Sequence, residues 1–237
     1  MRDRFRTLNG LMGCLVSLYA NSDLGRPLRL RSKSTFEFLQ RFCHLTHLGL
    51  GLSLVTFGLG LVLRCLKRNG KEVGVWESFY RDLLAITVTV ESFIPLIFWI
   101  LWSIDAGSVV TRDNYIGEDT ISMFFNLCMH GIPSVFLLVE FFLGEFVPAR
   151  SHYLELGCFF LIYLGIMQGV YWATGRWPYQ VVGYFTGWWR VFFFANCLVT
   201  LIGIYWMLTR MHARVWRPAS RKYRRPAKRP SSGRKNK

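Results

Sequence analysis

Charged residues are scarce in this sequence of 237 residues, at 18% of the chain, whereas soluble globular proteins carry about a quarter. Acidic residues are scarcer than basic ones, because 14 Asp and Glu stand against 29 Lys and Arg. In their place, 52% of the residues are apolar. This composition excludes an ordinary soluble domain and indicates a membrane protein.

The six cysteines contain no CxxC pair, and most of them lie within apolar runs. A cysteine in such a run usually behaves as a small apolar side chain. A secreted fold held together by disulfides is therefore not expected. We interpret the apolar stretch at residues 8–20 as a retained first membrane span, because no convincing signal-peptidase cleavage site follows it.

Long apolar stretches account for most of the chain. A membrane-spanning helix needs about 20 mostly apolar residues, and five stretches qualify: 42–63, 83–104, 121–143, 154–173 and 188–208. Residues 8–20 add a sixth, shorter stretch. With six spans, 21 of the 29 basic residues fall on the side that carries both termini, which the positive-inside rule makes cytoplasmic. The sequence predicts an all-α, polytopic membrane helix bundle with six spans and both termini in the cytoplasm.

The C-terminal region is strongly basic, since 12 of the basic residues lie between Arg210 and Lys237 and no acidic residue does. We predict a transmembrane helical domain over residues 1–209 and a disordered basic cytoplasmic tail over residues 210–237. The motif at 221–225 suits attraction to anionic lipid headgroups, at about 1 kcal/mol per charge. Nucleic-acid binding is not expected of a chain anchored in a membrane. Residues 234–237 approximate a dilysine-type retrieval signal, which favours the endoplasmic reticulum membrane.

Few ionisable side chains lie inside the apolar stretches, and burying such groups in hydrocarbon is costly, so each is a functional candidate. They are His44, His47, Glu91, His130 and Glu140. His130 lies roughly 14 Å inside its span at 1.5 Å per residue, which favours a functional role. His44 and His47 lie near a helix end, where an interfacial histidine is unremarkable. Glu140 is close enough to the other end of its helix to reach water.

Three of these groups, His44, His47 and His130, raise the question of a metal site. His44 and His47 are three residues apart and share a helix face, and three histidines suit zinc or iron. No carboxylate-rich or HxxHH-type cluster accompanies them, and only His130 is deep enough for a haem ligand. We therefore expect no metal and no cofactor.

Thr46 and His130 are candidates for nucleophilic catalysis, which needs a hydroxyl, a base to take its proton and a dry pocket. Their two helices begin on the same outward side in the six-span topology. Thr46 lies about 6 Å deep at 1.5 Å per residue, and boundary errors of about 2–4 residues can close the gap to His130. A Thr–His pair is therefore topologically allowed. Glu91 lies among hydroxyl residues that are expected to hydrogen-bond it: Thr87, Thr89 and Ser92.

The segment 126–140 begins with Asn126, carries His130 four residues later and ends with Glu140. It resembles the most recognisable segment of the androgen-induced membrane protein family, whose members are multi-span hydrolases of fatty acid esters of hydroxy fatty acids. The run FCHLTHLG at residues 42–49 is similar to the threonine segment of that family, and residues 175–179 to its aromatic-proline motif. The resemblance covers roughly residues 35–208 and is that of a divergent, fungal-type member.

Two positions depart from the family pattern, because Leu127 replaces a second histidine and His44 replaces an apolar residue. A second alignment, through residues 36–39, puts Gln40 at the nucleophile position. Thr46 is the better match, since Gln40 cannot act as a nucleophile and residues 48–50 extend the similarity.

The resemblance implies an intramembrane lipid esterase in which His130 takes a proton from Thr46 and the Thr46 oxygen attacks the ester. Asn126 lies one helical turn before His130 and is the candidate for orienting its ring. Glu91 and Trp177 are further candidates for orienting groups or binding the substrate. Two other classes stay open: a non-catalytic membrane scaffold or lipid-binding protein, and a small transporter that uses His130 and Glu91 as relay groups.

Overall fold

The computed structural model describes residues 2–106 and 121–220, and every secondary-structure element within those residues is helical. The elements are α1 (Arg2–Asn21), η1 (Leu28–Leu30), α2 (Thr35–Gln40), η2 (Arg41–Cys43), α3 (Leu45–Arg68), α4 (Gly74–Ile104), α5 (Met123–His130), α6 (Ile132–Leu143), α7 (Ser151–Thr174), α8 (Gln180–Tyr184) and α9 (Trp188–Ser220).

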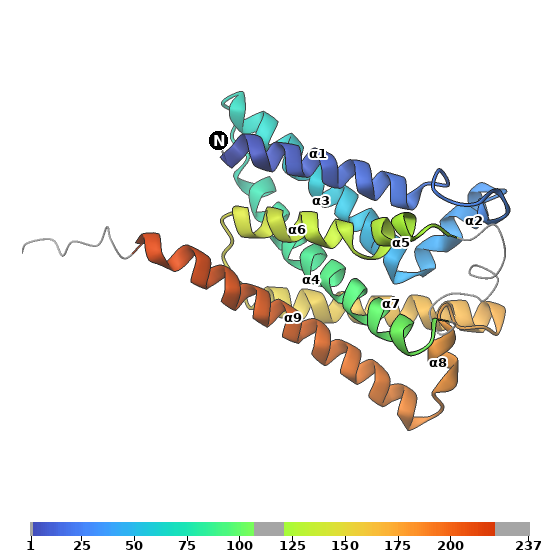
Figure 1. Cartoon of the computed structure of the whole chain (residues 1–237). Coiled ribbons are helices and arrows are strands. Elements are labelled where there is room, and N and C mark those ends of the chain that lie inside the picture. Colours follow the sequence, from blue (N-terminus) through green and yellow to red (C-terminus); the bar gives the residue numbers. More distant parts are fainter. Residues whose placement is uncertain (1, 107–120, 221–237) are drawn as a thin grey trace, which may run out of the picture.

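Five helical segments are long and apolar enough to cross a membrane, namely α3, α4, the α5–α6 pair, α7 and α9. They confirm the predicted all-α membrane bundle. The helix α1 packs beside α3 and α6 (Figure 1) but is not one of these five, so the sixth span stays a prediction. The start of α1 and the C-terminal end of α9 lie at the same end of the bundle, where the Arg2 guanidinium is 4.1 Å from the centre of the Trp216 ring.

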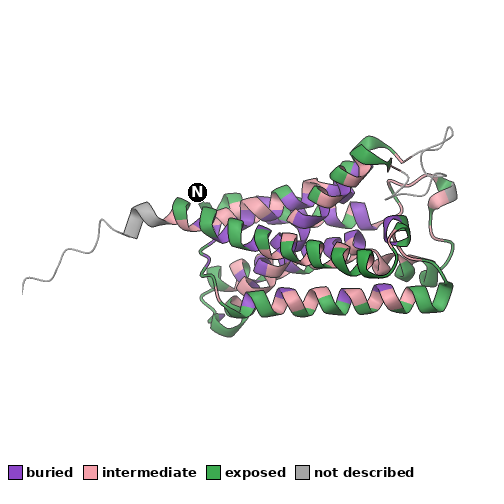
Figure 2. Cartoon of the chain, turned by 90° about the horizontal axis from the view of Figure 1, so that it is seen from below, coloured by how far each residue is buried: buried purple, intermediate pink, exposed green. Residues whose placement is uncertain are grey.

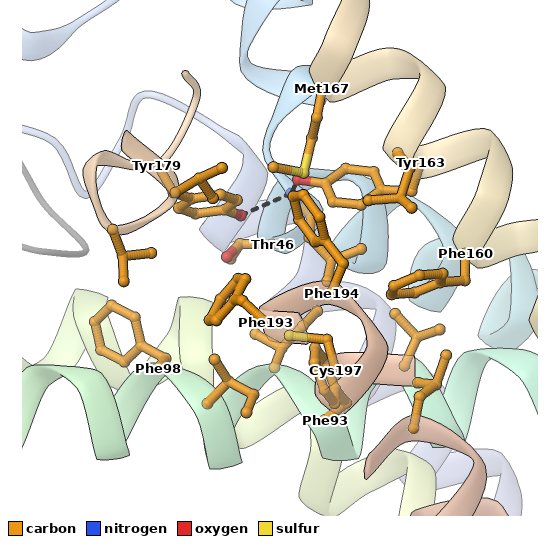
Figure 3. A pocket seen from close by; sticks show the side chains of 18 of the residues that line it. Thr46, Phe93, Phe98, Phe160, Tyr163, Met167, Tyr179, Phe193, Phe194 and Cys197 are labelled. Carbon is orange, nitrogen blue, oxygen red and sulfur yellow. Dashed lines mark hydrogen bonds between the residues drawn. The ribbon is translucent and has the colours of Figure 1, made fainter. Parts of the chain in front are cut away.

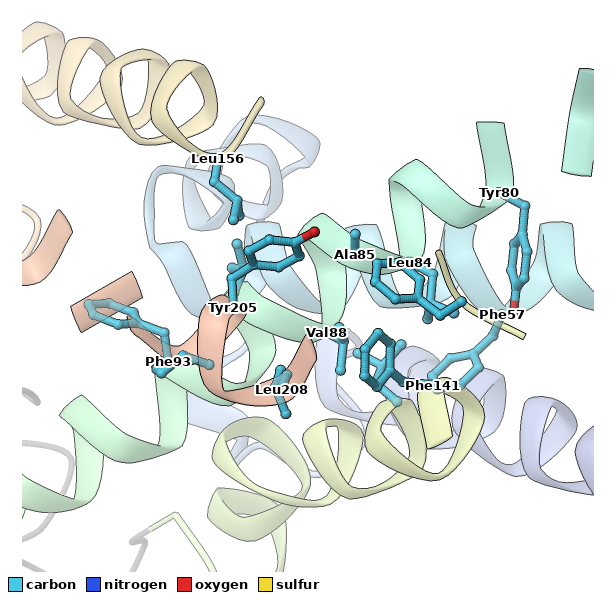
Figure 4. Close-up of a cluster of buried hydrophobic side chains, with 14 of the residues drawn as sticks. Phe57, Tyr80, Leu84, Ala85, Val88, Phe93, Phe141, Leu156, Tyr205 and Leu208 are labelled. Atoms are coloured by element: carbon cyan, nitrogen blue, oxygen red, sulfur yellow. The ribbon is translucent and has the colours of Figure 1, made fainter. Parts of the chain in front are cut away.

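The helix α4 runs through the middle of the bundle and contacts α3, α6, α7 and α9. In its most apolar stretch 56% of the residues are buried, against 17% in α7 and 22% in α9. The two outer helices therefore present apolar side chains outward, where lipid would cover them (Figure 2). The main apolar core gathers side chains from α3, α4, α6 and α9, among them Phe57, Val88, Phe141 and Tyr205 (Figure 4).

The stretch 121–143, predicted as one helix, is broken at Gly131. The helix α5 ends at His130 and α6 begins at Ile132, with Gly131 between them at φ −156° and ψ −56°. Pro133 explains the break, because a proline has no N–H for the carbonyl four residues earlier and its ring clashes with that carbonyl. In a membrane such an interruption is tolerated only where protein covers it. His130 accordingly ends a half-helix in the buried interior.

Glu140 is only 1% exposed, so the prediction that its carboxylate reaches water is wrong. Its Oε1 accepts hydrogen bonds from Arg6 at 2.6 Å, Arg64 at 2.8 Å and the Tyr80 hydroxyl at 2.7 Å. The carboxylate can be buried because the guanidinium groups of two other helices form ion pairs with it. These contacts join α1, α3, α4 and α6 at the end of the bundle that holds the N-terminus.

The helix α9 ends at Ser220, beyond the boundary predicted at residue 209. Two contacts hold the added turns against the end of α6. The His212 Nε2 lies 3.0 Å from the Gly144 carbonyl oxygen, and the Trp216 Nε1–H donates to the Phe142 carbonyl at 3.2 Å. The first residues of the expected tail are therefore helical and packed. The motif at 221–225 and the signal at 234–237 lie outside the described residues.

Candidate active site

Thr46 is the second residue of α3, which begins at Leu45. His44, just before the helix, has an extended conformation and makes no side-chain cap. The Thr46 side chain is buried and projects into an apolar cavity (Figure 3). A hydroxyl at this position lies beside the unpaired N–H groups that form the positive end of the helix dipole.

The cavity lies between the start of α3 and the helices α4, α7, α8 and α9. The cavity has a volume of about 110 Å³, whereas one water needs about 10–15 Å³ by the same measure. The lining is apolar except for Thr46, Tyr163, Tyr179 and Cys197, and the first three lie together in Figure 3. Dry walls with a few converging polar groups are typical of a site for a mostly apolar ligand.

Two tyrosine hydroxyls cover the start of α3. The backbone N–H of Leu45 donates to the hydroxyl oxygens of Tyr163 and Tyr179, each at 2.9 Å. Tyr163 belongs to α7 and Tyr179 directly precedes α8, so two distant segments meet beside Thr46. The Tyr179 hydroxyl also lies within hydrogen-bonding reach of the Thr46 side chain, and burial raises the pKa of Tyr179.

His130 lies behind one wall of this cavity. Its ring stacks on Phe98 of α4, with 3.6 Å between the ring centres and 9° between the ring planes. Phe98 in turn lines the cavity together with Thr46. The break at Gly131 ends α5 at His130, whose ring faces α4.

Asn126 holds the His130 ring in one orientation. The His130 Nδ1 is 2.8 Å from Asn126 Oδ1 and 3.2 Å from the Asn126 carbonyl oxygen. A backbone carbonyl can only accept, so Nδ1 carries the proton and donates it. The Nε2 atom then keeps the lone pair that a general base requires. This contact agrees with the expectation that the two side chains share a helix face.

Phe98 stacks on His130 and lines the same cavity as Thr46, but among the described residues no hydrogen bond joins Thr46 to His130. A proton can pass between them only when Thr46 Oγ1 and His130 Nε2 come closer. Catalytic hydrogen bonds are often long before substrate binds and shorten in the complex. The two side chains therefore lie in the same part of the bundle without a hydrogen bond between them.

His47 lies in the first turn of α3, near the helix end as predicted, and its side chain is buried within the protein. Its Nδ1 is 2.9 Å from Asn21 Oδ1, and Arg26 Nη2 donates to its Nε2 at 2.8 Å. Burial lowers the pKa of Arg26 to about 10, which leaves the guanidinium charged at neutral pH. The histidines considered for a metal site are thus engaged separately. Across residues 2–106 and 121–220, no group of three or more His, Cys, Asp or Glu side chains is placed to hold a metal ion.

Glu91 faces α3 and does not line the cavity. It is 1% exposed, and a Cβ added to Gly49 would come within 2.6 Å of its Oε1, so Gly49 makes room for the carboxyl group. The expected hydrogen bonds from its neighbours are wrong, because each hydroxyl is engaged elsewhere. Thr87 pairs with a threonine of α3, whereas Thr89 and Ser92 donate to carbonyls of their own helix.

Trp177 packs behind the cavity wall instead of lining it. Its ring stacks on Tyr171 with 4.5 Å between centres, and the Arg190 guanidinium lies 4.7 Å from its ring centre. It belongs to the apolar cluster that contains Tyr163 and Val182. Trp177 thus supports the segment from which Tyr179 projects, and the sequence motif that singled it out contained Tyr179 two residues later.

A second polar cluster, which the sequence did not reveal, lies at the other end of the bundle. The His152 Nε2 is 3.1 Å from Asp82 Oδ1, and the Tyr205 hydroxyl lies 2.6 Å from His152 Nδ1. These residues join α4, α7 and α9. His152 did not stand out because it falls in a polar stretch between two predicted spans.

The comparison with known families matches most of the chain. A family model described as FAR-17a/AIG1-like protein matches residues 7–213. The match runs from α1 into α9 and includes Thr46, Asn126 and His130. Neither a curated protein nor a solved structure gives a match.

Proposed function

The chain belongs to the FAR-17a/AIG1-like protein family, and on this premise we propose that it is an integral membrane lipid esterase. The proposed substrates are fatty acid esters of hydroxy fatty acids, which are hydrolysed within the bilayer by Thr46 and His130. One observation carries the proposal: the Thr46 hydroxyl lies at the polar end of an apolar cavity, and a wall residue of that cavity, Phe98, stacks on His130. A lipid ester has the matching shape, an apolar chain beside one polar reacting group.

In the proposed acylation step, His130 Nε2 takes the proton of Thr46 while Oγ1 bonds to the carbonyl carbon of the ester. The π electron pair of the carbonyl moves onto its oxygen. When this intermediate collapses, the bond to the alkoxy oxygen breaks. His130 gives the proton to that oxygen, and the hydroxy fatty acid leaves.

In the second step a water molecule attacks the acyl-threonine. His130 takes a proton from the water and returns it to Thr46 Oγ1 as the bond from Oγ1 to the acyl carbon breaks. The free fatty acid leaves and the enzyme is restored. Asn126 serves both steps by keeping the proton on Nδ1, so that Nε2 is free to accept. The apolar walls keep bulk water away from the acyl-enzyme.

A lipid-like fluorophosphonate tests this proposal, because it bonds to an activated hydroxyl. The purified protein should take the label in detergent, and Thr46→Ala should lose it. Thr56→Ala is the matched control, since Thr56 is a buried threonine of the same helix that does not line the cavity. Full labelling of Thr46→Ala would remove Thr46 from the mechanism. A wild-type protein that neither takes the label nor hydrolyses esters would overturn the proposed function.

A lipid-binding protein without catalysis is the second candidate, and the apolar cavity favours it. Such a protein would retain an ester in the cavity without turnover and would ignore the fluorophosphonate. The transporter hypothesis needs Glu91 and His130 on one polar path. It is disfavoured because the cavity lining is apolar and Glu91 faces Gly49 of α3.

We also propose that the protein resides in the endoplasmic reticulum membrane and that its basic C-terminus attracts anionic headgroups. Both proposals come from the composition of residues 221–237, which carry nine basic residues and no acidic one. A surface attraction of this kind is worth about 1 kcal/mol per basic residue and weakens as salt is added.

A further inference from the structure

The polar end of the cavity contains more than the proposed nucleophile. Besides Thr46, it holds the hydroxyls of Tyr163 and Tyr179, and both lie 2.9 Å from the backbone nitrogen of Leu45. Any ester carbonyl that reaches Thr46 Oγ1 must therefore lie next to this group of donors. The question is which of them would bind the carbonyl oxygen.

The first backbone N–H groups of α3 have no partner within the helix, and they form its positive end. His44, the residue before the helix, provides no side-chain cap. The two tyrosine oxygens take over this role by accepting from Leu45 N–H. A hydroxyl that accepts such a bond becomes a stronger donor through its own proton, because hydrogen bonds in a chain polarise one another.

The two hydroxyl protons have different partners. The Tyr163 hydroxyl donates to the Cys43 carbonyl oxygen at 3.2 Å, so its proton is engaged with the backbone. The Tyr179 hydroxyl lies within hydrogen-bonding reach of the Tyr163 hydroxyl and of the Thr46 side chain, and within the described part of the chain no backbone carbonyl accepts its proton. Burial raises the pKa of Tyr179, so the phenol keeps this proton at neutral pH. Tyr179 thus has a proton that no backbone carbonyl of the described residues holds, and its hydroxyl lies beside Thr46, where the chemistry would occur.

We propose that the Tyr179 hydroxyl donates a hydrogen bond to the carbonyl oxygen of the ester and stabilises the oxyanion that forms there. In the tetrahedral intermediate the acyl carbon is bonded to Thr46 Oγ1, so its oxygen is only two bonds from Oγ1. A donor within reach of Oγ1 is therefore within reach of the oxyanion. This role exists only if the chain is the proposed Thr–His esterase.

The chemistry balances without transfer of the tyrosine proton. As Oγ1 bonds to the carbonyl carbon, the π electron pair moves onto the carbonyl oxygen, and the Thr46 proton goes to His130. The Tyr179 O–H bond stays intact and its hydrogen bond to that oxygen shortens as negative charge develops. Such a donor is catalytic because the interaction is stronger in the transition state than with the bound ester.

The expected effect of Tyr179→Phe follows from this difference. Loss of one oxyanion donor lowers kcat by about 100- to 1000-fold, and KM should change little because the ground-state ester binds mainly through its chain. Tyr163→Phe is the matched control, since it removes a neighbouring hydroxyl whose proton is engaged with Cys43. We expect Tyr163→Phe to lower kcat by less than about 10-fold, because the hydroxyl that it removes makes a structural hydrogen bond.

The experiment compares ester hydrolysis by the wild type, Thr46→Ala, Tyr179→Phe and Tyr163→Phe, purified in one detergent, at equal amounts of monodisperse protein. A kcat loss confined to Tyr179→Phe and Thr46→Ala supports the inference. Incorporation of 3-fluorotyrosine at position 179 covers the case in which Tyr179→Phe does not fold. This substitution keeps the hydroxyl and makes it a stronger donor, so kcat should equal or exceed that of the wild type.

The outcomes separate this inference from the function on which it rests. If the wild type hydrolyses esters and Thr46→Ala does not, but Tyr179→Phe keeps the wild-type kcat, the esterase stands and the oxyanion role of Tyr179 is wrong. Equal losses in Tyr179→Phe and Tyr163→Phe would also reject it, because they would indicate a shared structural role. A wild type without hydrolytic activity would overturn the esterase, and the role of Tyr179 with it.

Discussion

Replacing Glu140 by glutamine should destabilise the bundle strongly, because the change removes the one negative charge that Arg6 and Arg64 share. The Glu140 side chain is 1% exposed, and the two guanidinium groups are 18% and 15% exposed. Removing one partner of a buried ion pair costs about 3–5 kcal/mol, since the remaining charge is left uncompensated. For a chain of this size, a loss of that order lowers Tm by roughly 6–20 °C.

Glu77→Gln is the matched control. Glu77 accepts from Lys67 at 2.7 Å, but the two side chains are 41% and 50% exposed, and such a surface pair is worth about 0–1 kcal/mol. We would follow thermal unfolding of both variants by size-exclusion chromatography after heating in one detergent. Equal shifts in Tm for the two variants would refute the reasoning, because the buried ion pairs of Glu140 would then contribute no more to stability than the exposed pair of Glu77.

The remaining predictions concern the site and the C-terminus. His130→Ala should reduce ester hydrolysis to background at normal folded yield, whereas His44→Ala and His47→Ala should keep most of the rate per folded molecule; full activity of purified His130→Ala would reject the mechanism. Asn126→Ala should lower kcat through loss of the orienting contact to His130, by no more than the roughly 100- to 10,000-fold that a general base contributes, and an unchanged kcat would leave Asn126 a packing role only. Protease added outside sealed microsomes with the cytoplasmic face outward should remove residues 221–237, and a protected C-terminus would overturn the predicted topology.

Hydropathy predicted the membrane spans well, because whether a stretch can span a membrane depends mainly on the length and composition of that stretch alone. The helix α7 covers Ser151–Thr174, against a prediction of 154–173. The break at Gly131 was missed because apolar residues continue across it, although Pro133 was a usable signal. The end of α9 was also missed, since the basic side chains after residue 209 suggested a tail, whereas contacts of His212 and Trp216 with the end of α6 hold the helix together.

The environment of the polar side chains could not be read from the sequence in the same way. The partners of Glu140 are 134 and 76 residues away in the chain, so no local pattern reveals them. The position of Tyr179 beside Thr46 likewise depends on how α7 and the turn before α8 fold back on α3. Asn126 and His130 are the contrast, because a spacing of four residues on one helix was sufficient to predict their proximity.

The polar end of the cavity lies at the opposite end of the bundle from the start of α1 and the end of α9. When the bundle crosses a bilayer, Thr46 therefore lies at the level of one leaflet, and the start of α1 and the end of α9 lie at the level of the other. Under the proposed function, esters in the leaflet beside the end of α9 must first flip across the bilayer before they can be hydrolysed. The turnover of such esters in a cell would then follow the rate of lipid flipping, and both acid products would start in the leaflet that faces away from the termini.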